Sequence, residues 1–183
     1  MSVRCISVRR FSIGRPLRGL SSPWVQSDVI TRSKSRFQGY CTPITSESQI
    51  APAIEELLQL HKKVGKASHP AMYAWKTADS HISMKKGADN DPILKELRNL
   101  RQGYDDCGER GSGDRLMGLL DRMRLVNVLV AVTRWYGGVH LGPARFRCIS
   151  DCAGEALKKG GYVSVSGKGW VDVAAIDRTT RAK

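Results

Sequence analysis

The strongest constraint on the fold is VNVLVAVT at residues 126–133, an apolar segment that no charged residue interrupts. It is rich in β-branched residues, which favour strands. An unbroken apolar strand, as opposed to an alternating one, is typical of a position that is covered on both faces or central in a sheet. We therefore predict that this segment is a central strand and that the rest of the chain packs around it.

Three amphipathic helices are predicted from the spacing of apolar residues. The first lies within residues 46–65, where Ser46 and Gln49 have the spacing of a capping box. The second runs through residues 108–124 after a glycine-rich turn, and the third spans 143–160, from a proline to a glycine. In each helix the apolar residues recur at intervals of three and four positions, so that they share one face.

Further strands are predicted at residues 35–44 and 67–77, and another in the tail at 161–176. A short helix is predicted to begin at Pro92, within a surface insertion over residues 76–110. This order of elements favours an α/β or α+β two-layer sandwich, with helices on one face of a sheet of about four strands.

One folded domain is expected over residues 31–162, followed by a C-terminal extension at 163–183. Residues 1–30 are expected to be a flexible basic tail or a transit peptide. The first 27 residues contain five arginines and no acid, as mitochondrial transit peptides do, but two glycines and a proline interrupt the amphipathic helix that such peptides form. We expect a cytoplasmic protein, with the mitochondrial matrix as the alternative location.

The net charge of +13 favours a polyanionic partner, because lysines and arginines that contact phosphates release condensed counterions. Five of these charges are the arginines of the first 27 residues, which leaves +8 on the remaining chain. Ribosome or nucleic-acid contact is therefore one interpretation, and an ordinary solvated surface is the other. No apolar segment approaches the roughly 18 residues that a membrane helix requires, so no membrane association is expected.

The five cysteines are odd in number and include no C-x-x-C pair, which fits a reducing compartment better than a disulfide framework. Cys148 and Cys152 lie one helical turn apart, but the four histidines are scattered along the chain. We expect no metal site and no cofactor.

The turn at residues 105–115 precedes a helix and is rich in glycine, a pattern that can cradle a phosphate. It lacks the lysine of a P-loop, and the carboxylates of Asp105, Asp106 and Glu109 repel phosphate. These acids are predicted to form the turn and stabilise the helix N-terminus. The alternative is an enzyme whose site lies between this turn and the loop at 134–146.

The loop TRWYGGVHLGPARF at residues 133–146 directly follows the predicted central strand. Trp135 and Tyr136 are able to stack on RNA bases, and Arg134 to bind a phosphate or a partner carboxylate. Alternatively, the aromatic residues close the core and Arg134 pairs with Glu109 or Asp106. We favour a mixture, in which one aromatic is buried while Arg134 and Arg145 are presented on an exposed rim.

Four segments together resemble the IMPACT family, which is related to bacterial YigZ: GERGSGDRLMGLL, VNVLVAVTRWYGGVHLGPARF, KSRF and ASHPAMYAW. The resemblance covers about residues 31–160 and is most specific in the pattern R-W-Y-G-G-x-x-L-G-P-x-R-F. It implies the two-layer α/β fold of the C-terminal domain of small-subunit ribosomal protein five. That fold agrees with the predicted order of elements.

The resemblance also implies a non-enzymatic regulator of translation. Eukaryotic members of the family bind the ribosome-associated coactivator of the amino-acid-starvation kinase and so limit phosphorylation of initiation factor 2; ribosomes and actin monomers are further partners. Those regulators carry an N-terminal RWD domain, and we expect a short, fungal-type member without one, because few residues precede Arg32. An RNA-binding module is the alternative. The insertion at about 78–102 is longer than in animal relatives.

Two groups of residues are predicted to form the site, and the motif residues carry over from the resemblance. The expected partner-binding residues are Arg134, Trp135, Tyr136, Arg145 and Arg147. The motif residues of the turn and loop are Gly108, Glu109, Gly113, Arg115, Gly137, Gly138, Leu141, Gly142, Pro143 and Phe146. We expect the turn and the loop to meet in space, since each caps a neighbouring element.

Overall fold

A computed structural model describes residues 24–60, 62–79, 84–86, 92–94, 96–162 and 169–176. Most of the predicted N-terminal tail therefore lies outside the described residues. Within these ranges, no helix is both long enough and apolar enough to cross a bilayer.

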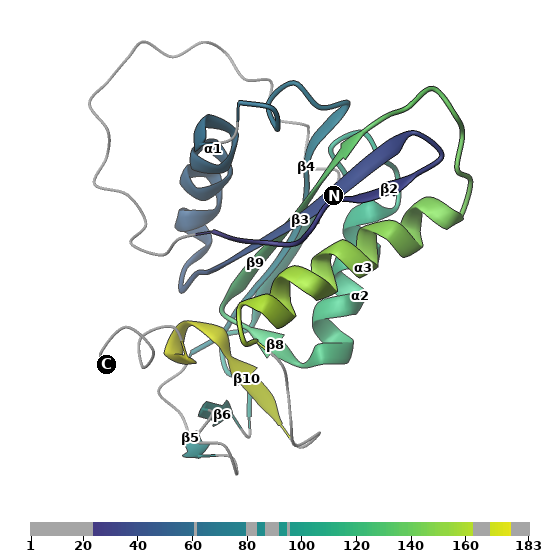
Figure 1. Cartoon of the computed structure of the whole chain (residues 1–183). Helices are drawn as coiled ribbons and strands as arrows, with labels where there is room; N and C mark the ends of the chain where they lie inside the picture. Colours follow the sequence, from purple (N-terminus) through teal and green to yellow (C-terminus); the bar gives the residue numbers. More distant parts are fainter. Residues whose placement is uncertain are drawn as a thin grey trace.

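The main sheet has six antiparallel strands (Figure 1). Along the sheet the order is β1 (Val25–Gln26), β3 (Ser35–Pro43), β9 (Val128–Trp135), β4 (His69–Thr77) and β7 (Arg101–Asp105), with β2 (Ile30–Arg32) also paired to β3. The middle position of β9 confirms the predicted central strand. Its side chains are buried from Val128 to Arg134, as expected for a strand that is covered on both faces.

A second, smaller sheet contains β5 (Met84–Lys86), β6 (Pro92–Leu94), β10 (Trp170–Asp172) and β8 (Leu125–Val126). The strand β10 confirms the prediction of a strand in the tail, and it runs parallel to β8. The helix predicted to begin at Pro92 is wrong, because this segment forms β6 and, after a loop, β7. β6 pairs with the nearby β5 and with the distant β10, and β7 pairs with the distant β4. Partners distant in sequence leave no local periodic signal.

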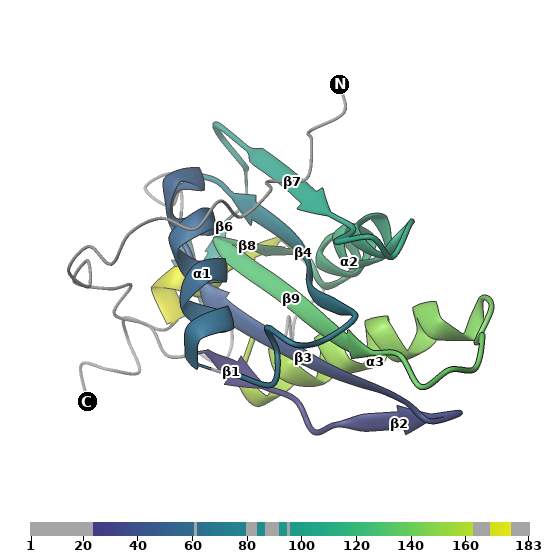
Figure 2. The same ribbon diagram turned by 90° about the horizontal axis from the view of Figure 1, so that it is seen from above.

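The two faces of the main sheet carry different helices (Figures 1 and 2). One face is covered by α2 (Ser112–Met123) and α3 (Ala144–Lys159), which pack on Val130 and Val132 of β9. The opposite face holds η1 (Glu47–Gln49) and α1 (Ile50–Leu60), which pack near Leu129 and Ala131. The α+β fold class is confirmed, whereas the sheet has more strands than expected and a helix lies on each face.

Local sequence signals explain where the helices begin and end. The capping box of Ser46 and Gln49 is present, but it caps η1, from which α1 continues. The third helix begins after Pro143 and ends at Gly160, as predicted. This helix packs closely on β3 at Gly39, where an added Cβ would lie 2.3 Å from the carbonyl oxygen of Cys152.

Candidate functional site

Three elements bring side chains to the carboxylate of Glu109, a buried residue in the turn before α2. Its Oε2 forms an ion pair with Arg134 at the end of β9 and lies 3.3 Å from His69 Nε2 at the start of β4. Its Oε1 lies 2.7 Å from Arg145 Nε in the first turn of α3. The expected meeting of the turn and the loop is therefore confirmed. We call these four residues the Glu109 cluster.

Arg134 is 5% exposed, so the prediction that it is presented on an exposed rim is wrong. The side chains of β9 alternate between the two faces of the sheet, and position 134 shares the α2 and α3 face with Val132. A guanidinium buried there needs a counter-charge. Glu109 supplies it, as the alternative interpretation predicted, and the rings of Phe37 and Tyr136 lie 5.4 and 5.3 Å from the guanidinium carbon.

Arg145 is likewise held within the molecule, with 25% of its side chain exposed. Besides its ion pair with Glu109, it donates a hydrogen bond from Nη1 to the carbonyl oxygen of Gly142, at 2.8 Å. Arg145 thus links the loop to the turn and is not displayed on a free rim, which corrects the second half of the same prediction.

His69 was not predicted to be a member of this cluster. Its Nδ1 lies 2.9 Å from the carbonyl oxygen of Cys107, and its Nε2 faces Glu109. Because both ring nitrogens face acceptors, only the doubly protonated ring donates in both directions. His69 and Glu109 are separated by 40 positions, and neither lies in a shared periodic pattern that would have linked them.

The two aromatic residues of the loop occupy different environments, but neither is fully buried, although the favoured interpretation predicted this for one of them. Trp135 is half-buried on the α1 face, where its indole Nε1 donates a 3.0 Å hydrogen bond to the carbonyl oxygen of Lys63. The guanidinium of Arg36 lies 5.3 Å from its ring centre. Tyr136 is 40% exposed. Its ring lies 5.8 Å from that of His140, which is also exposed.

Asp105 and Asp106 do what was predicted of the turn acids, whereas the carboxylate of Glu109 pairs instead with Arg134 and Arg145. Asp106 accepts hydrogen bonds from the backbone amides of Gly113 at 2.7 Å and Gly111 at 3.0 Å, and Asp105 accepts one from Cys107. The N-terminus of α2 is therefore occupied by a carboxylate of the chain itself, where a phosphate would otherwise bind. Over the described ranges, no three His, Cys, Asp or Glu side chains are placed to hold a metal ion.

The buried cysteines lie in the core, away from the Glu109 cluster. Cys41 and Cys152 pack in the layer between the sheet and the helices α2 and α3. Burial raises the pKa of the Cys41 thiol well above its ordinary value, and it raises the pKa of Cys152 to about 12. Both thiols are therefore protonated at neutral pH and are poor nucleophiles.

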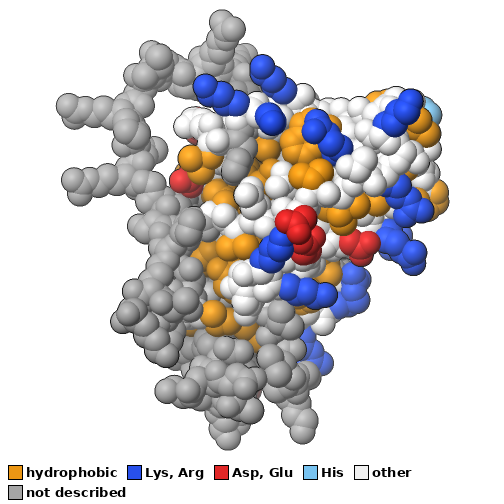
Figure 3. Space-filling view, viewed as in Figure 1, with side chains coloured by type: hydrophobic (Ala, Val, Ile, Leu, Met, Phe, Trp, Pro, Cys, Tyr) orange, Lys and Arg blue, Asp and Glu red, His pale blue; other side chains and the backbone are white. Residues whose placement is uncertain are grey.

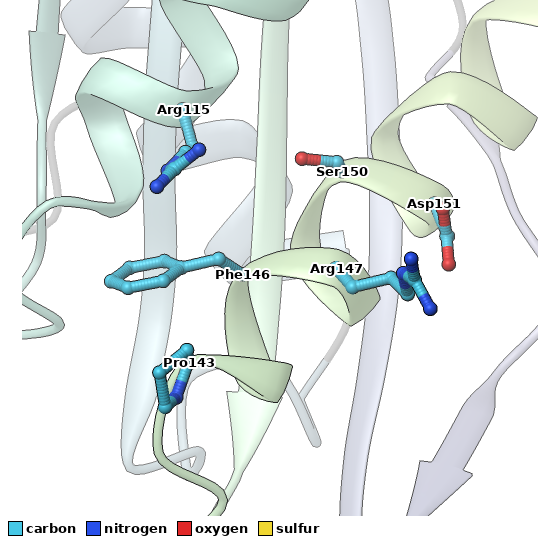
Figure 4. Close-up of a pocket in the computed structure, with 6 residues that line it drawn as sticks. All are labelled: Arg115, Pro143, Phe146, Arg147, Ser150 and Asp151. Atoms are coloured by element: carbon cyan, nitrogen blue, oxygen red, sulfur yellow. The ribbon is translucent and has the colours of Figure 1, made fainter.

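A pocket of about 360 Å³ opens between α2 and α3 (Figure 4). Its lining residues are Arg115, Pro143, Phe146, Arg147, Ser150 and Asp151. The guanidinium carbons of Arg115 and Arg145 lie 5.2 and 4.1 Å from the ring centre of Phe146, which places this ring between the pocket and the Glu109 cluster.

The pocket unites three motif residues with Arg147, whereas Trp135 and Tyr136 do not line it. Ser150 and Asp151 were not predicted. They follow Arg147 on α3 by one helical turn, and this spacing was the available signal.

Comparisons with known proteins place this site within a defined family. The family model described as the Impact N-terminal domain matches residues 33–157. The IMPACT family member YDL177C of Saccharomyces cerevisiae is 45% identical, over 76% of this chain and 93% of its own length. The Protein IMPACT homolog of Schizosaccharomyces pombe is 37% identical over 73% of this chain.

This chain spans 41% of the length of the S. pombe relative. Among solved structures, that of the two-domain translational regulator Yih1 is similar, with 33% identity and a TM-score of 0.46. The similarity covers 83% of this chain and 55% of the Yih1 chain.

Proposed function

The chain belongs to the IMPACT family, and from this premise we propose that it is a non-enzymatic regulator of translation. Its proposed partner is the ribosome or the ribosome-associated coactivator of the amino-acid-starvation kinase. By occupying that partner it would limit phosphorylation of initiation factor 2. The proposed site of action is the cytoplasm, where this machinery works.

The observation that carries the proposal is the family match over residues 33–157, which contains both the turn and the loop. Regulation of translation is what the family resemblance implies for eukaryotic members. Since this chain spans less than half of the S. pombe relative, the route through the kinase belongs to the proposal and is the part that needs direct measurement.

The charge of the chain supports an anionic partner such as the ribosome. The sequence has 30 lysines and arginines against 17 acids. Long-range attraction between such a protein and a polyanion speeds their encounter and weakens with added salt. Because Arg134 and Arg145 are engaged by Glu109, the proposed contact surface is formed by the exposed part of the loop around Tyr136 and by the α2–α3 pocket.

The test is sedimentation of the tagged, full-length chain with ribosomes from growing and amino-acid-starved cells, together with measurement of phosphorylated initiation factor 2. We expect cosedimentation that falls with rising salt, and less phosphorylated factor when the chain is overproduced. A basic protein of similar size and charge serves as the control. The proposal would be refuted if the chain dissociates from ribosomes with rising salt as readily as this control does, and if its overproduction leaves phosphorylation of initiation factor 2 unchanged.

A further inference from the structure

We propose that the pocket between α2 and α3 and the adjoining arginine of α2 bind the phosphodiester backbone of RNA, with Arg115, Arg122 and Arg147 as the phosphate ligands. This inference rests on the proposed action at the ribosome. It adds to that proposal a defined surface and a chemical class of ligand. We call these three residues the arginine triad.

The charges of α2 are divided between two sides of the helix. Asp114 and Asp121 are seven positions apart and share one side, where Asp121 forms an ion pair with Lys76 of β4. Arg115 and Arg122 are also seven positions apart and share the side next to α3, since the Arg115 guanidinium lies over Phe146. Neither acid of this helix lines the pocket.

Arg122 extends back along its helix toward Arg115. Its Nη1 lies 3.4 Å from the place where a Cβ on Gly118 would be. Arg115 of α2 and Arg147 of α3 both line the pocket, and in Figure 4 the Arg147 side chain points away from Arg115, toward Asp151. The space-filling view shows lysine and arginine side chains along the side of the molecule where α2 and α3 lie, with a few acids beside them (Figure 3).

The arginine triad has no acidic partner within the described part of the chain. All three side chains are exposed, and the ion pairs of this part involve other cations, among them Arg134, Arg145, Lys76 and Lys159. Behind Phe146, the one carboxylate of Glu109 is shared by two guanidinium groups. The two arginines that line the pocket therefore outnumber its one carboxylate, Asp151, and an excess of positive charge also lies behind Phe146.

The ends of the two helices reinforce this charge. Both α2 and α3 begin at the Glu109 cluster, so that their positive dipole ends lie side by side. Asp106 caps α2, but the N-cap of α3, Pro143, has no side-chain cap and lines the pocket. Ser150 adds a hydroxyl donor to the wall.

Exposed aromatic residues favour RNA over an acidic peptide as the ligand. Tyr104 is 51% exposed and packs over Gly113 at the start of α2, and Tyr136 is 40% exposed in the loop. Neither ring lines the pocket, but exposed aromatic rings on a basic surface offer platforms on which bases stack. The planar guanidinium fork of arginine also fits a phosphate in a bidentate manner.

Asp151 is the one carboxylate that lines the pocket. It lies four positions after Arg147 but forms no ion pair with it among the described contacts. A phosphate should therefore bind nearer to Arg115 than to Asp151. We expect Asp151→Asn to tighten RNA binding by about two- to threefold, since it removes a repulsive charge at a solvent-exposed site.

The decisive experiment measures fluorescence anisotropy of a labelled single-stranded RNA of about 20 nucleotides with the full-length chain, across a series of salt concentrations. We expect R115Q/R122Q/R147Q to weaken binding at least about tenfold and to lower the slope of log K against log salt by about 2, the value for three lost phosphate contacts on a single strand. Circular dichroism melts check that the variant is folded.

The matched control is K62Q/K63Q/K66Q, which removes three exposed charges just after α1, on the opposite face of the sheet. Its RNA affinity should stay within about twofold of the wild type, apart from the general effect of net charge. Equal losses in the two triple variants would overturn the inference, and so would a larger loss in the control.

Two further probes identify the ligand. Polyglutamate of matched charge should compete poorly; if it binds as tightly as RNA and is equally sensitive to the triad, the surface recognises acidic polymers and the inference fails. The inference would likewise be refuted if inorganic phosphate saturates the pocket while the same chain shows no measurable affinity for RNA. If the triad variant loses RNA binding but the wild type fails to sediment with ribosomes, the proposed function fails and the RNA site stands.

Discussion

The arginines on the two sides of Phe146 differ in almost every physical respect. Arg134 and Arg145 lie on the inner side, where they share Glu109 and are largely removed from water. The arginine triad lies on the outer side, exposed and without an acid partner among the described residues. Arginine side chains therefore join separate elements of the fold on the inner side. On the outer side they leave positive charge available to a ligand.

This difference shows how burial decides the role of a charge. A buried guanidinium that loses its carboxylate is costly, because it can neither be solvated nor easily deprotonated. An exposed one costs little whether it is paired or free. The inner arginines should therefore affect stability, and the outer ones should affect binding.

The largest effect is expected for Glu109→Ala. This substitution leaves Arg134 buried without its counter-charge and removes the link between β4, β9, α3 and the turn before α2. We expect a loss of about 3–5 kcal/mol in the free energy of unfolding, measured by urea denaturation. Glu47→Ala is the control, because its ion pair with Arg101 is exposed on both sides and should contribute less than about 1 kcal/mol. Equal losses of unfolding free energy in the two variants would show that the buried ion pairs of Glu109 stabilise the fold no more than an exposed pair does.

The next effect is the coupling between the partners of the buried pair. Glu109→Gln and Arg134→Met should each destabilise the chain, and the double variant should be more stable than the sum of the two losses predicts. The reason is that the second substitution removes the group that the first left unpaired. We expect a coupling free energy of about 1–3 kcal/mol from a double-mutant cycle. Additive losses would mean that Arg145 and His69 balance Glu109 without Arg134.

The sharpest test compares two neighbouring positions of α3. Arg145→Gln removes an ion pair with a buried carboxylate and should cost about 1–2 kcal/mol. Arg147→Gln, two positions on, should change stability by less than about 0.5 kcal/mol while weakening RNA binding. Thermal melts and anisotropy on both variants give the two readouts. If Arg147→Gln proves the more destabilising of the two, the outer arginine is structural and the comparison is reversed.

The smallest effect on stability near neutral pH is expected for the buried thiols. Burial decides the behaviour of these groups as it does that of the arginines. Because burial raises the pKa of Cys152 to about 12, its thiol stays protonated in the folded chain, while in the unfolded chain it ionises near its ordinary value of 9.0. The neutral thiol thus stabilises the fold fully below pH 9, and this contribution is lost as the pH rises from 9 toward 12.

Alkylation with iodoacetamide at pH 8 checks this behaviour. Cys107, which is half-buried, should react well before Cys41 and Cys152, and mass spectrometry of the peptides gives the order. Early modification of Cys152 in the folded chain would show that α3 does not protect it.

The regular elements were predicted where the local pattern was strong. Residues 128–133 of the apolar segment became part of β9, whereas Val126 belongs to β8 of the smaller sheet. The proline and glycine at the ends of α3 set the limits of that helix. The prediction failed at Pro92, where a proline and a short periodic segment indicated a helix but β6 and β7 formed instead. The strand partners at residues 69–77 and 170–172 are distant and leave no trace in a local window, and the nearby partner at 84–86 is only three residues long.

For the candidate site, the sequence alone determined which stretches matter, since the turn and the loop carry the family pattern, and Asp106 and Glu109 were identified within the turn. Only the tertiary structure decided which arginines are free. The alternation of β9 turned Arg134 inward onto Glu109, while the side of α2 next to α3 left Arg115 and Arg122 exposed. The physical reason is that a charge has the same formal value anywhere in a sequence, but its free energy depends on the water and counter-charges that surround it in the fold.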